Sequence, residues 1–108
     1  MVISSVAYAG WTKVTKATSG VSIYIDFDRI RKTGIKTYFW KLVDFPKPKK
    51  IAVPLMLSNT EYLEAEAGSF RSRYLVANVY PTPMANGTPS ETFKGQKDWD
   101  YPNPNIVE

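Results

Sequence analysis

The sequence predicts a mainly β protein with a single antiparallel sheet of about five or six strands and one short helical turn. Aromatic residues make up 14% of the 108 residues, and together with the β-branched residues they favour strands. Alternating or apolar runs are separated by Gly, Pro and Asn, which mark turns. The length fits one small domain, and a hydrophobic content of 44% is enough for a compact core.

The first two strands are predicted to form a hairpin. Residues 11–16 open on Trp11 and are predicted to form a strand. Residues 17–20 have the composition of a turn, and residues 21–27 are rich in β-formers.

A helical turn and a long strand are expected next. Asp28 can cap a helix, so residues 29–32 are predicted to form one helical turn, with basic side chains at its end. Gly34 can adopt the left-handed conformation that closes such a turn. Residues 35–45 are apolar on both faces, which predicts a central strand that is covered on both sides.

The middle of the chain is harder to assign. Residues 46–50 contain two prolines and three lysines, so they are expected to break the sheet and project into water. Residues 51–57 are apolar but contain Pro54, which favours an edge strand or a covering loop. Residues 58–66 fit either a helix that begins with a capping box at Ser58 or a strand.

The last third is predicted to return to the sheet. Residues 68–80 alternate and indicate a second long strand. Residues 81–87 form a long turn, and residues 91–93 add a short strand. We expect Trp99 to plug the sheet.

The two ends of the chain have their own signatures. Residues 1–9 resemble the end of a secretory signal peptide, because Ala7 and Ala9 occupy the small positions of a cleavage site. The alternative is an added strand along an exposed edge. Residues 10–101 then form the β domain, and residues 102–108 form an extended tail.

The composition excludes several kinds of chemistry. The chain has no cysteine and no histidine, so disulfides, thiolate nucleophiles, zinc–sulfur sites and a Ser-His-Asp mechanism are excluded. The Asp26/Asp28 and Asp98/Asp100 pairs lack the further oxygen ligands of a calcium loop. We therefore expect no metal, no cofactor and no enzymatic activity.

Charge divides the chain in two. Residues 1–50 carry ten Lys or Arg and three Asp, which gives a net charge of +7. Residues 51–108 carry four Lys or Arg and seven Asp or Glu, which gives a net charge of −3. A basic region attracts acidic partners such as sulfated glycans, anionic lipid or nucleic acid. No stretch approaches the roughly 20 apolar residues of a transmembrane helix.

Several motifs occur in a recognisable order. The segments are Trp11, Tyr24-Ile-Asp26 with Ile30 and Gly34, Trp40-Lys-Leu42-Val-Asp44-Phe45, Arg73-Tyr-Leu75, Tyr80-Pro-Thr-Pro-Met84-Ala-Asn-Gly87 and Trp99-Asp-Tyr-Pro102. Their order and spacing resemble the bacterial surface-adhesin E family over roughly residues 11–101. The resemblance also favours a strand over residues 58–66.

The resemblance implies an exported protein of the periplasm or the cell surface, associated with the outer membrane. The best-known relatives bind host matrix or serum proteins. The chain departs from the family pattern because it lacks a cysteine near Gly68, a C-terminal helix and the partner cysteine that follows this helix. A sheet face without that helix lacks a cover, so a homodimer is expected.

These observations favour a binding module. Its ligand is expected to be an acidic extracellular macromolecule, either a matrix protein or a sulfated glycan. Basic residues of the helical turn and of the Pro-Lys segment are the expected contacts, namely Arg29, Arg31, Lys32, Lys47, Lys49 and Lys50.

Two other functions stay open. Residues 1–9 could pair with a second copy, which would make the protein a self-associating structural subunit. Alternatively, a small basic β domain could bind single-stranded nucleic acid by stacking bases on Tyr24, Tyr38, Trp40 and Tyr74. The modest net charge and the predicted export argue against nucleic acid.

Overall fold

The structure is a computed structural model and describes residues 10–50 and 55–101. Strands make up 63% of it and lie in one antiparallel sheet, which confirms the predicted fold class. The strands are β1 (Trp11–Lys16), β2 (Ser22–Asp26), β3 (Arg31–Thr33), β4 (Lys36–Lys50), β5 (Leu55–Glu66), β6 (Arg71–Tyr80) and β7 (Glu91–Lys94), and the 3₁₀ turns are η1 (Phe27–Arg29) and η2 (Pro83–Ala85).

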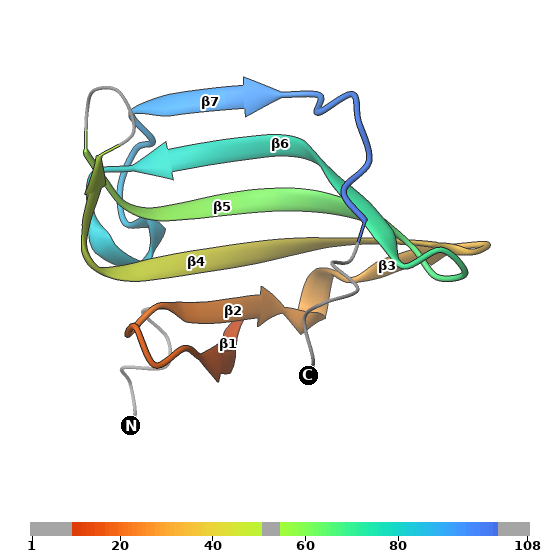
Figure 1. The fold of residues 1–108 in the computed structure, drawn as a ribbon, viewed down its shortest axis with the longest axis horizontal. Coiled ribbons are helices and arrows are strands. Elements are labelled where there is room, and N and C mark those ends of the chain that lie inside the picture. The colour runs from red at the N-terminus through yellow and green to blue at the C-terminus, as the bar shows by residue number, and fades with distance from the viewer. Residues whose placement is uncertain (1–9, 51–54, 102–108) are drawn as a thin grey trace.

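The strands follow the order β1-β2-β4-β5-β6-β7, and the short β3 pairs with the start of β4. Figure 1 shows β4 to β7 stacked side by side, with the β1–β2 hairpin along the lower edge. β4 is 15 residues long and pairs with β2, β3 and β5. It is therefore the spine of the sheet, as the apolar run in its sequence predicted.

The pairing register separates two faces of the sheet, because successive side chains of a strand point to opposite sides. Tyr38 and Trp40 of β4 lie opposite Glu64 and Tyr62 of β5. We call their side the aromatic–basic face. The other side, which we call the apolar face, carries Ile23, Phe39, Val43, Leu57, Leu63, Ala77 and Val79.

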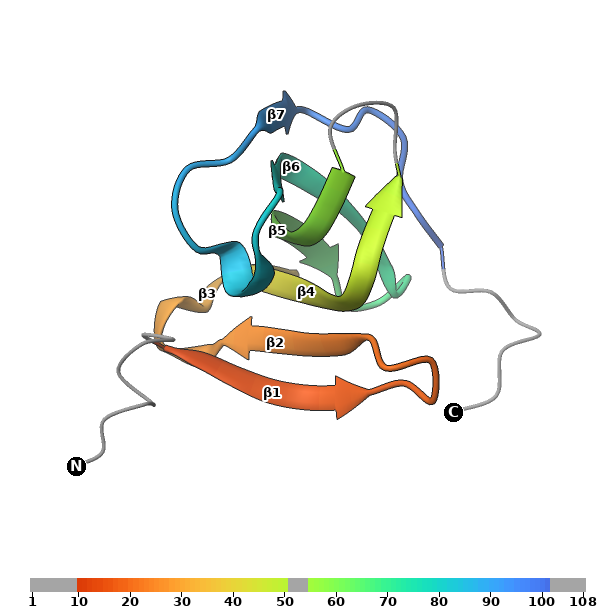
Figure 2. The same cartoon turned by 90° about the vertical axis from the view of Figure 1, so that its left-hand side faces the viewer.

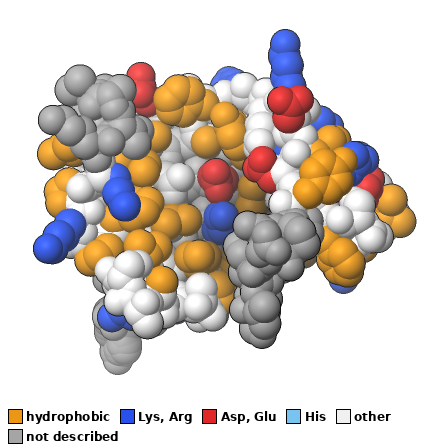
Figure 3. Space-filling view, viewed as in Figure 1, with side chains coloured by type: hydrophobic (Ala, Val, Ile, Leu, Met, Phe, Trp, Pro, Cys, Tyr) orange, Lys and Arg blue, Asp and Glu red, His pale blue; other side chains and the backbone are white. Residues whose placement is uncertain are grey.

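The apolar face is only partly covered. Leu63, Ala77 and Val79 are buried, whereas Phe39 and Val43 are half-buried. Figure 3 shows hydrophobic side chains gathered across the face of the sheet that is turned to the viewer. An ion pair crosses the strands on the apolar face, from Lys41 Nζ to Glu61 Oε1 at 3.3 Å.

The turn η2 packs against the sheet through buried polar groups. Ser58 is fully buried; its Oγ donates to the Thr82 carbonyl at 2.7 Å and accepts from the Ala85 N–H at 2.8 Å. The Asp44 carboxylate accepts from the Met84 N–H at 2.7 Å. Figure 2 shows this turn on one side of the bent sheet. Leu42, which is also fully buried, lies on the same face as Ser58.

The predicted helical turn was wrong in its position and in its cap. The capping residue is Asp26, whose side chain accepts a hydrogen bond from the Asp28 N–H, and the turn η1 ends at Arg29. Residues 31–33 form β3, where Arg31 pairs with Tyr38. Gly34, at φ +64°, stands in the tight turn between β3 and β4. Strand pairing thus replaces the second half of the expected helical turn.

The predicted break at residues 46–50 was also wrong, because β4 continues to Lys50. Pairing with β2 ends at Asp44, and the register with β5 is irregular between Asp44 and Lys49. Proline lacks an N–H to donate to a ladder, and within the described part of the chain Pro46 and Pro48 occupy positions that need no such donor. Residues 58–66 form a strand, so the capping box at Ser58 does not form.

Other predictions were confirmed or lie outside the described residues. The strands near residues 11–16, 21–27, 68–80 and 91–93 are confirmed as β1, β2, β6 and β7. The predictions for residues 1–9 and 102–108, and part of that for residues 51–57, fall where the structure gives no description. Trp99 does not plug the sheet: it lies against charged side chains, as described below.

Candidate functional site

Cations lie over aromatic rings along the aromatic–basic face. The Arg29 guanidinium carbon is 5.8 Å from the centre of the Trp40 ring, and that of Arg31 is 5.3 Å from the centre of the Tyr38 ring. Tyr62 packs against Trp40, with ring centres 5.1 Å apart. Each ring attracts the cation above it and holds the charge at the surface without neutralising it. The face therefore presents positive charge on an aromatic layer.

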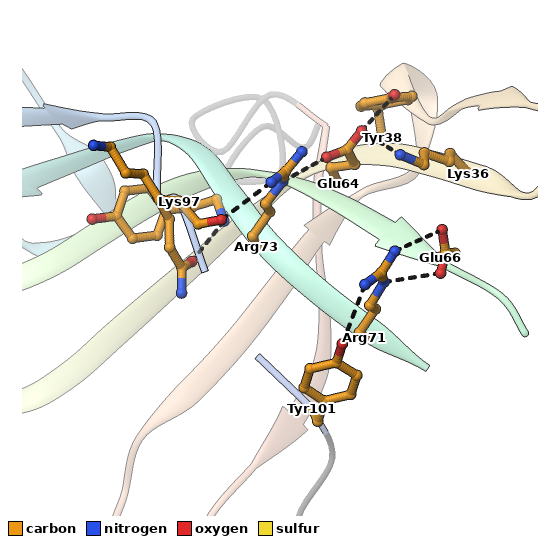
Figure 4. Close-up of polar contacts among 10 residues, drawn as sticks. Lys36, Tyr38, Glu64, Glu66, Arg71, Arg73, Lys97 and Tyr101 are labelled. Carbon is orange, nitrogen blue, oxygen red and sulfur yellow. Dashed lines mark hydrogen bonds and ion pairs between the residues drawn. The ribbon is translucent and has the colours of Figure 1, made fainter. Parts of the chain in front are cut away.

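A buried carboxylate lies at one end of this layer. Glu64 is 6% exposed and accepts hydrogen bonds from Tyr38 Oη at 2.8 Å, from Arg73 Nε at 2.9 Å and from Lys36 Nζ at 3.4 Å. Figure 4 shows these groups converging from β4, β5 and β6. The cluster joins three strands through one side chain.

Hydrogen bonding decides the charge state of Glu64. Burial by itself would raise the pKa of the Glu64 carboxyl, but the bonds from Tyr38, Arg73 and Lys36 outweigh it and hold this pKa below its ordinary value. The same bond to Glu64, followed by burial, raises the pKa of the Tyr38 hydroxyl. Glu64 is therefore a structural anion that fixes the cations around it.

A second carboxylate repeats the arrangement two residues along β5. Glu66 accepts from Arg71 Nε at 2.9 Å and from Ser69 Oγ at 2.8 Å. These bonds lower the pKa of the Glu66 carboxyl. Arg71 also donates to Tyr101 Oη at 3.2 Å, as Figure 4 shows.

Trp99 lies against the cations of this cluster. Its ring centre is 4.1 Å from the guanidinium carbons of both Arg71 and Arg73 and 5.2 Å from Lys36 Nζ. The segment that carries it is held by the backbone bridge between Asp100 and Ser72. The sequence predicted that this ring plugs the sheet; it is instead half-buried against guanidinium groups, which attract an aromatic face.

The structure places the six predicted contact residues in two groups. Arg29, Arg31 and Lys32 are exposed on η1 and β3, beside the start of β4. Lys47, Lys49 and Lys50 lie at the far end of β4. Lys49 lies eleven positions after Tyr38, the partner of Arg31, on β4, which corresponds to a path of about 36 Å along the strand. The two groups therefore do not form one patch.

The two groups also differ in their surroundings. Lys47 and Lys49, both exposed, border a hollow of about 360 Å³ that is also lined by Ser19, Val21 and the two prolines of β4. Of Lys50 only the backbone is described. Lys32 pairs with Thr37 and points to the opposite face from Arg31.

Sequence reasoning missed Lys36, Arg71 and Arg73 as members of the basic surface. A signal for two of them was present. Glu64 and Glu66 alternate on one strand, and Arg71 and Arg73 alternate on the next. Antiparallel pairing places Glu64 opposite Arg73 and Glu66 opposite Arg71.

A small groove opens on the same face beside Arg29. It has a volume of about 240 Å³ and is lined by Trp11, Arg29, Trp40, Thr60, Asn78 and Tyr80, with Ala85 of η2 as a further wall. These residues come from β1, η1, β4, β5, β6 and η2. Strands that are far apart in the sheet order thus line one hollow.

The rings considered for nucleic-acid stacking are not all on one side. Tyr38 and Trp40 lie on the aromatic–basic face with Tyr24, which pairs with Leu42. Tyr74 pairs with Leu63 and points to the apolar face.

Among the described residues, no group of three or more acidic side chains stands close enough together to hold a metal ion. The helical segments in the described part of the chain are too short to cross a bilayer.

The fold and the site define a class of protein: a small antiparallel β domain with a partly open apolar face and a basic, aromatic opposite face. The chain belongs to the Surface-adhesin protein E family, whose model matches residues 11–108. This membership indicates an adhesin-like, non-enzymatic role and a protein that is exported or lies at the cell surface. No curated protein and no solved structure matches the chain.

Proposed function

We propose that this protein is an exported binding module of the cell surface or periplasm that attaches to acidic extracellular macromolecules, either a matrix protein or a sulfated glycan. The contacts are the two basic groups, Arg29, Arg31 and Lys32 at one end of β4 and Lys47, Lys49 and Lys50 at the other. One observation carries the proposal: guanidinium groups are exposed on a layer of aromatic rings, over Trp40 and Tyr38.

The separation of the basic groups favours an extended ligand. A path of about 36 Å along β4 separates the two groups, which favours a polyanion or an acidic protein surface over one small anion. Each exposed charge contributes weakly to binding and is screened by salt. Binding is therefore expected to depend on several contacts together and to weaken as the salt concentration rises.

The test is binding of the full chain to an immobilised sulfated glycan and to a matrix protein across a salt series. The variant Lys47→Glu/Lys49→Glu is compared with Lys94→Glu/Lys97→Glu, which changes the charge equally at two other exposed lysines. We expect the first variant to lose binding and the second to keep most of it. Equal losses would show that only net charge matters, and binding by both variants at the native level would contradict the proposal.

Self-association is the second candidate function. The observation that favours it is the apolar face, where Phe39, Val43 and Leu57 are only half-buried. An apolar surface of this kind is a common interface between copies of a chain.

A further inference from the structure

The groove beside Arg29 combines features of a small-molecule site. It is hollow and mixed in character, with aromatic walls from Trp11, Trp40 and Tyr80 and polar groups from Thr60 and Asn78. Binding sites for small ligands are typically apolar hollows with a few placed polar groups. At about 240 Å³ the groove is below the size of most drug-binding pockets and fits one sugar-sized unit.

Arg29 is held so that part of its guanidinium stays available. Its Nε donates to the Asp26 carboxylate, which is 2% exposed and also accepts from the Asp28 N–H at 3.1 Å. Within the described part of the chain, the two terminal nitrogens of Arg29 make no hydrogen bond. The side chain is 58% exposed, so these nitrogens can donate two parallel bonds to a carboxylate.

The wall of the groove is strained. Ala85 and its neighbour Met84 have φ values of 52° and 55°, a left-handed conformation that residues with a side chain rarely adopt. The bonds to Ser58 and Asp44 hold them there. Strain that buried groups enforce in this way is concentrated at functional sites. The strained wall therefore supports the hypothesis that the hollow has a function, which the contacts of Arg29 make specific.

The polar groups suit hydroxyl groups. Asn78 Nδ2 donates to Thr60 Oγ1 at 3.2 Å, and Asn78 Oδ1 accepts from Thr92 Oγ1 at 2.8 Å. Within the described residues, the second amide hydrogen of Asn78 and the hydroxyl proton of Thr60, which is 4% exposed at the floor of the groove, are left as donors, and an amide lone pair is left as an acceptor. Groups that donate and accept side by side match a sugar ring, whose hydroxyls do both.

We propose that this groove binds an acidic sugar, a uronate, with the carboxylate on Arg29, the ring against Trp11 and Tyr80, and hydroxyls on Thr60 and Asn78. The inference rests on the proposed function and deepens it, because it assigns one unit of an acidic glycan to one hollow. The other basic residues would then contact the rest of the chain of sugars.

The test is titration of the full chain with sodium glucuronate, followed by NMR of the three tryptophan indole N–H signals. These signals are assigned with Trp11→Phe, Trp40→Phe and Trp99→Phe. We expect the indole N–H signals of Trp11 and Trp40 to shift in a saturable way at millimolar glucuronate. The signal of Trp99, which lies against Arg71 and Arg73, should not shift. Arg29→Lys should weaken binding by about tenfold, the loss of a bidentate charged contact.

Lys13→Arg is the matched control, because Lys13 is also exposed over a ring, that of Tyr24, but lies outside the groove and outside the proposed contact residues. It should leave glucuronate binding unchanged. Folding of each variant is checked from its dispersed NMR spectrum, and Asn78→Ala gives an independent variant on another strand.

Several results would overturn the inference. One is the absence of saturable shifts of the Trp11 and Trp40 signals, and others are shifts of equal size with acetate or binding of neutral glucose as tight as that of glucuronate. Tighter binding of an N-acetylated amino acid than of glucuronate would assign the groove to a peptide carboxylate. Failure with glucuronate while the sulfated glycan still binds through Lys47 and Lys49 would overturn the groove assignment alone. Loss of glycan binding with intact glucuronate binding would instead contradict the proposed function.

Discussion

Glu64 of β5 and Arg73 of β6 face each other across the sheet and are joined by a hydrogen bond of 2.9 Å from Arg73 Nε to Glu64 Oε1. The Glu64 carboxylate also accepts hydrogen bonds from Tyr38 Oη and Lys36 Nζ of β4. One buried anion thus connects three strands and orders the cations on the surface above it.

Replacing Glu64 by Gln is expected to destabilise the fold. The change keeps the shape but removes the charge that three donors share, and loss of charged hydrogen bonds at a buried site costs about 1–3 kcal/mol. Urea denaturation measures the change in the free energy of unfolding. The control is Glu61→Gln on the same strand, where the carboxylate is 22% exposed and, among the described residues, pairs with Lys41 alone; this change should cost less than about 1 kcal/mol. Equal losses would contradict a special role for Glu64.

Acid is expected to weaken the fold through the same carboxyl groups. The pKa values of Glu64 and Glu66 are lower in the folded state than their ordinary value of 4.5. A depressed pKa contributes stability that is fully present above the unfolded value and is lost as the pH falls through the folded value. Unfolding free energies at neutral pH and at about pH 3 measure this loss. Glu64→Gln should show a smaller difference between the two conditions, and an unchanged difference would contradict the assignment.

Phe70→Gly is expected to stabilise the protein. Phe70 has φ 58° and is 76% exposed. Its left-handed backbone is therefore strained, and burial of its ring offsets little of this strain. Glycine relieves the strain, and the net gain after its greater freedom in the unfolded chain is about 0.5–1 kcal/mol. Thermal unfolding measures the shift. Phe70→Ala, which keeps the strain, should not stabilise; a gain in this control would show that the ring and not the backbone is responsible.

The solution mass should rise with protein concentration, with or without residues 1–9. The reason is that the apolar face lies in the described sheet and does not depend on those residues. Light scattering across a concentration series measures the mass of both forms. Val43→Lys, on that face, should keep the protein monomeric. A monomer produced by the deletion alone would instead make residues 1–9 the pairing segment.

The central strands could be predicted because their side-chain patterns are unambiguous. β4 and β6 follow from long apolar or alternating runs, and β7 from a short one. The errors occur where pairing partners decide the conformation. Residues 31–33 have the composition of a helical turn but gain hydrogen bonds by pairing with β4. Residues 46–50 stay extended because their prolines occupy positions where no backbone N–H is needed for strand pairing.

The exposure of the basic side chains could be predicted, but their layout could not, and their role as ligand contacts stays a prediction. Arg29 and Arg31 were expected at the surface, and the structure places them there over Trp40 and Tyr38. The distance to Lys47 and Lys49 could not be predicted, because it depends on β4 continuing through Pro46. The position of Trp99 depends on Arg71 and Arg73 sharing one face, which emerges only after the register of β5 and β6 is known.

The prolines of β4 affect how readily the sheet can add strands from other copies of the chain. An open strand edge can template the addition of further chains and lead to fibrils. Beyond Asp44 the outer edge of β4 has no described neighbour, yet Pro46 and Pro48 supply no N–H there and Lys47 and Lys49 add charge. β7 is only four residues long. These features oppose edge-to-edge stacking along the end of β4 and along β7, so copies of this chain are expected to meet there through their faces and not by adding strands.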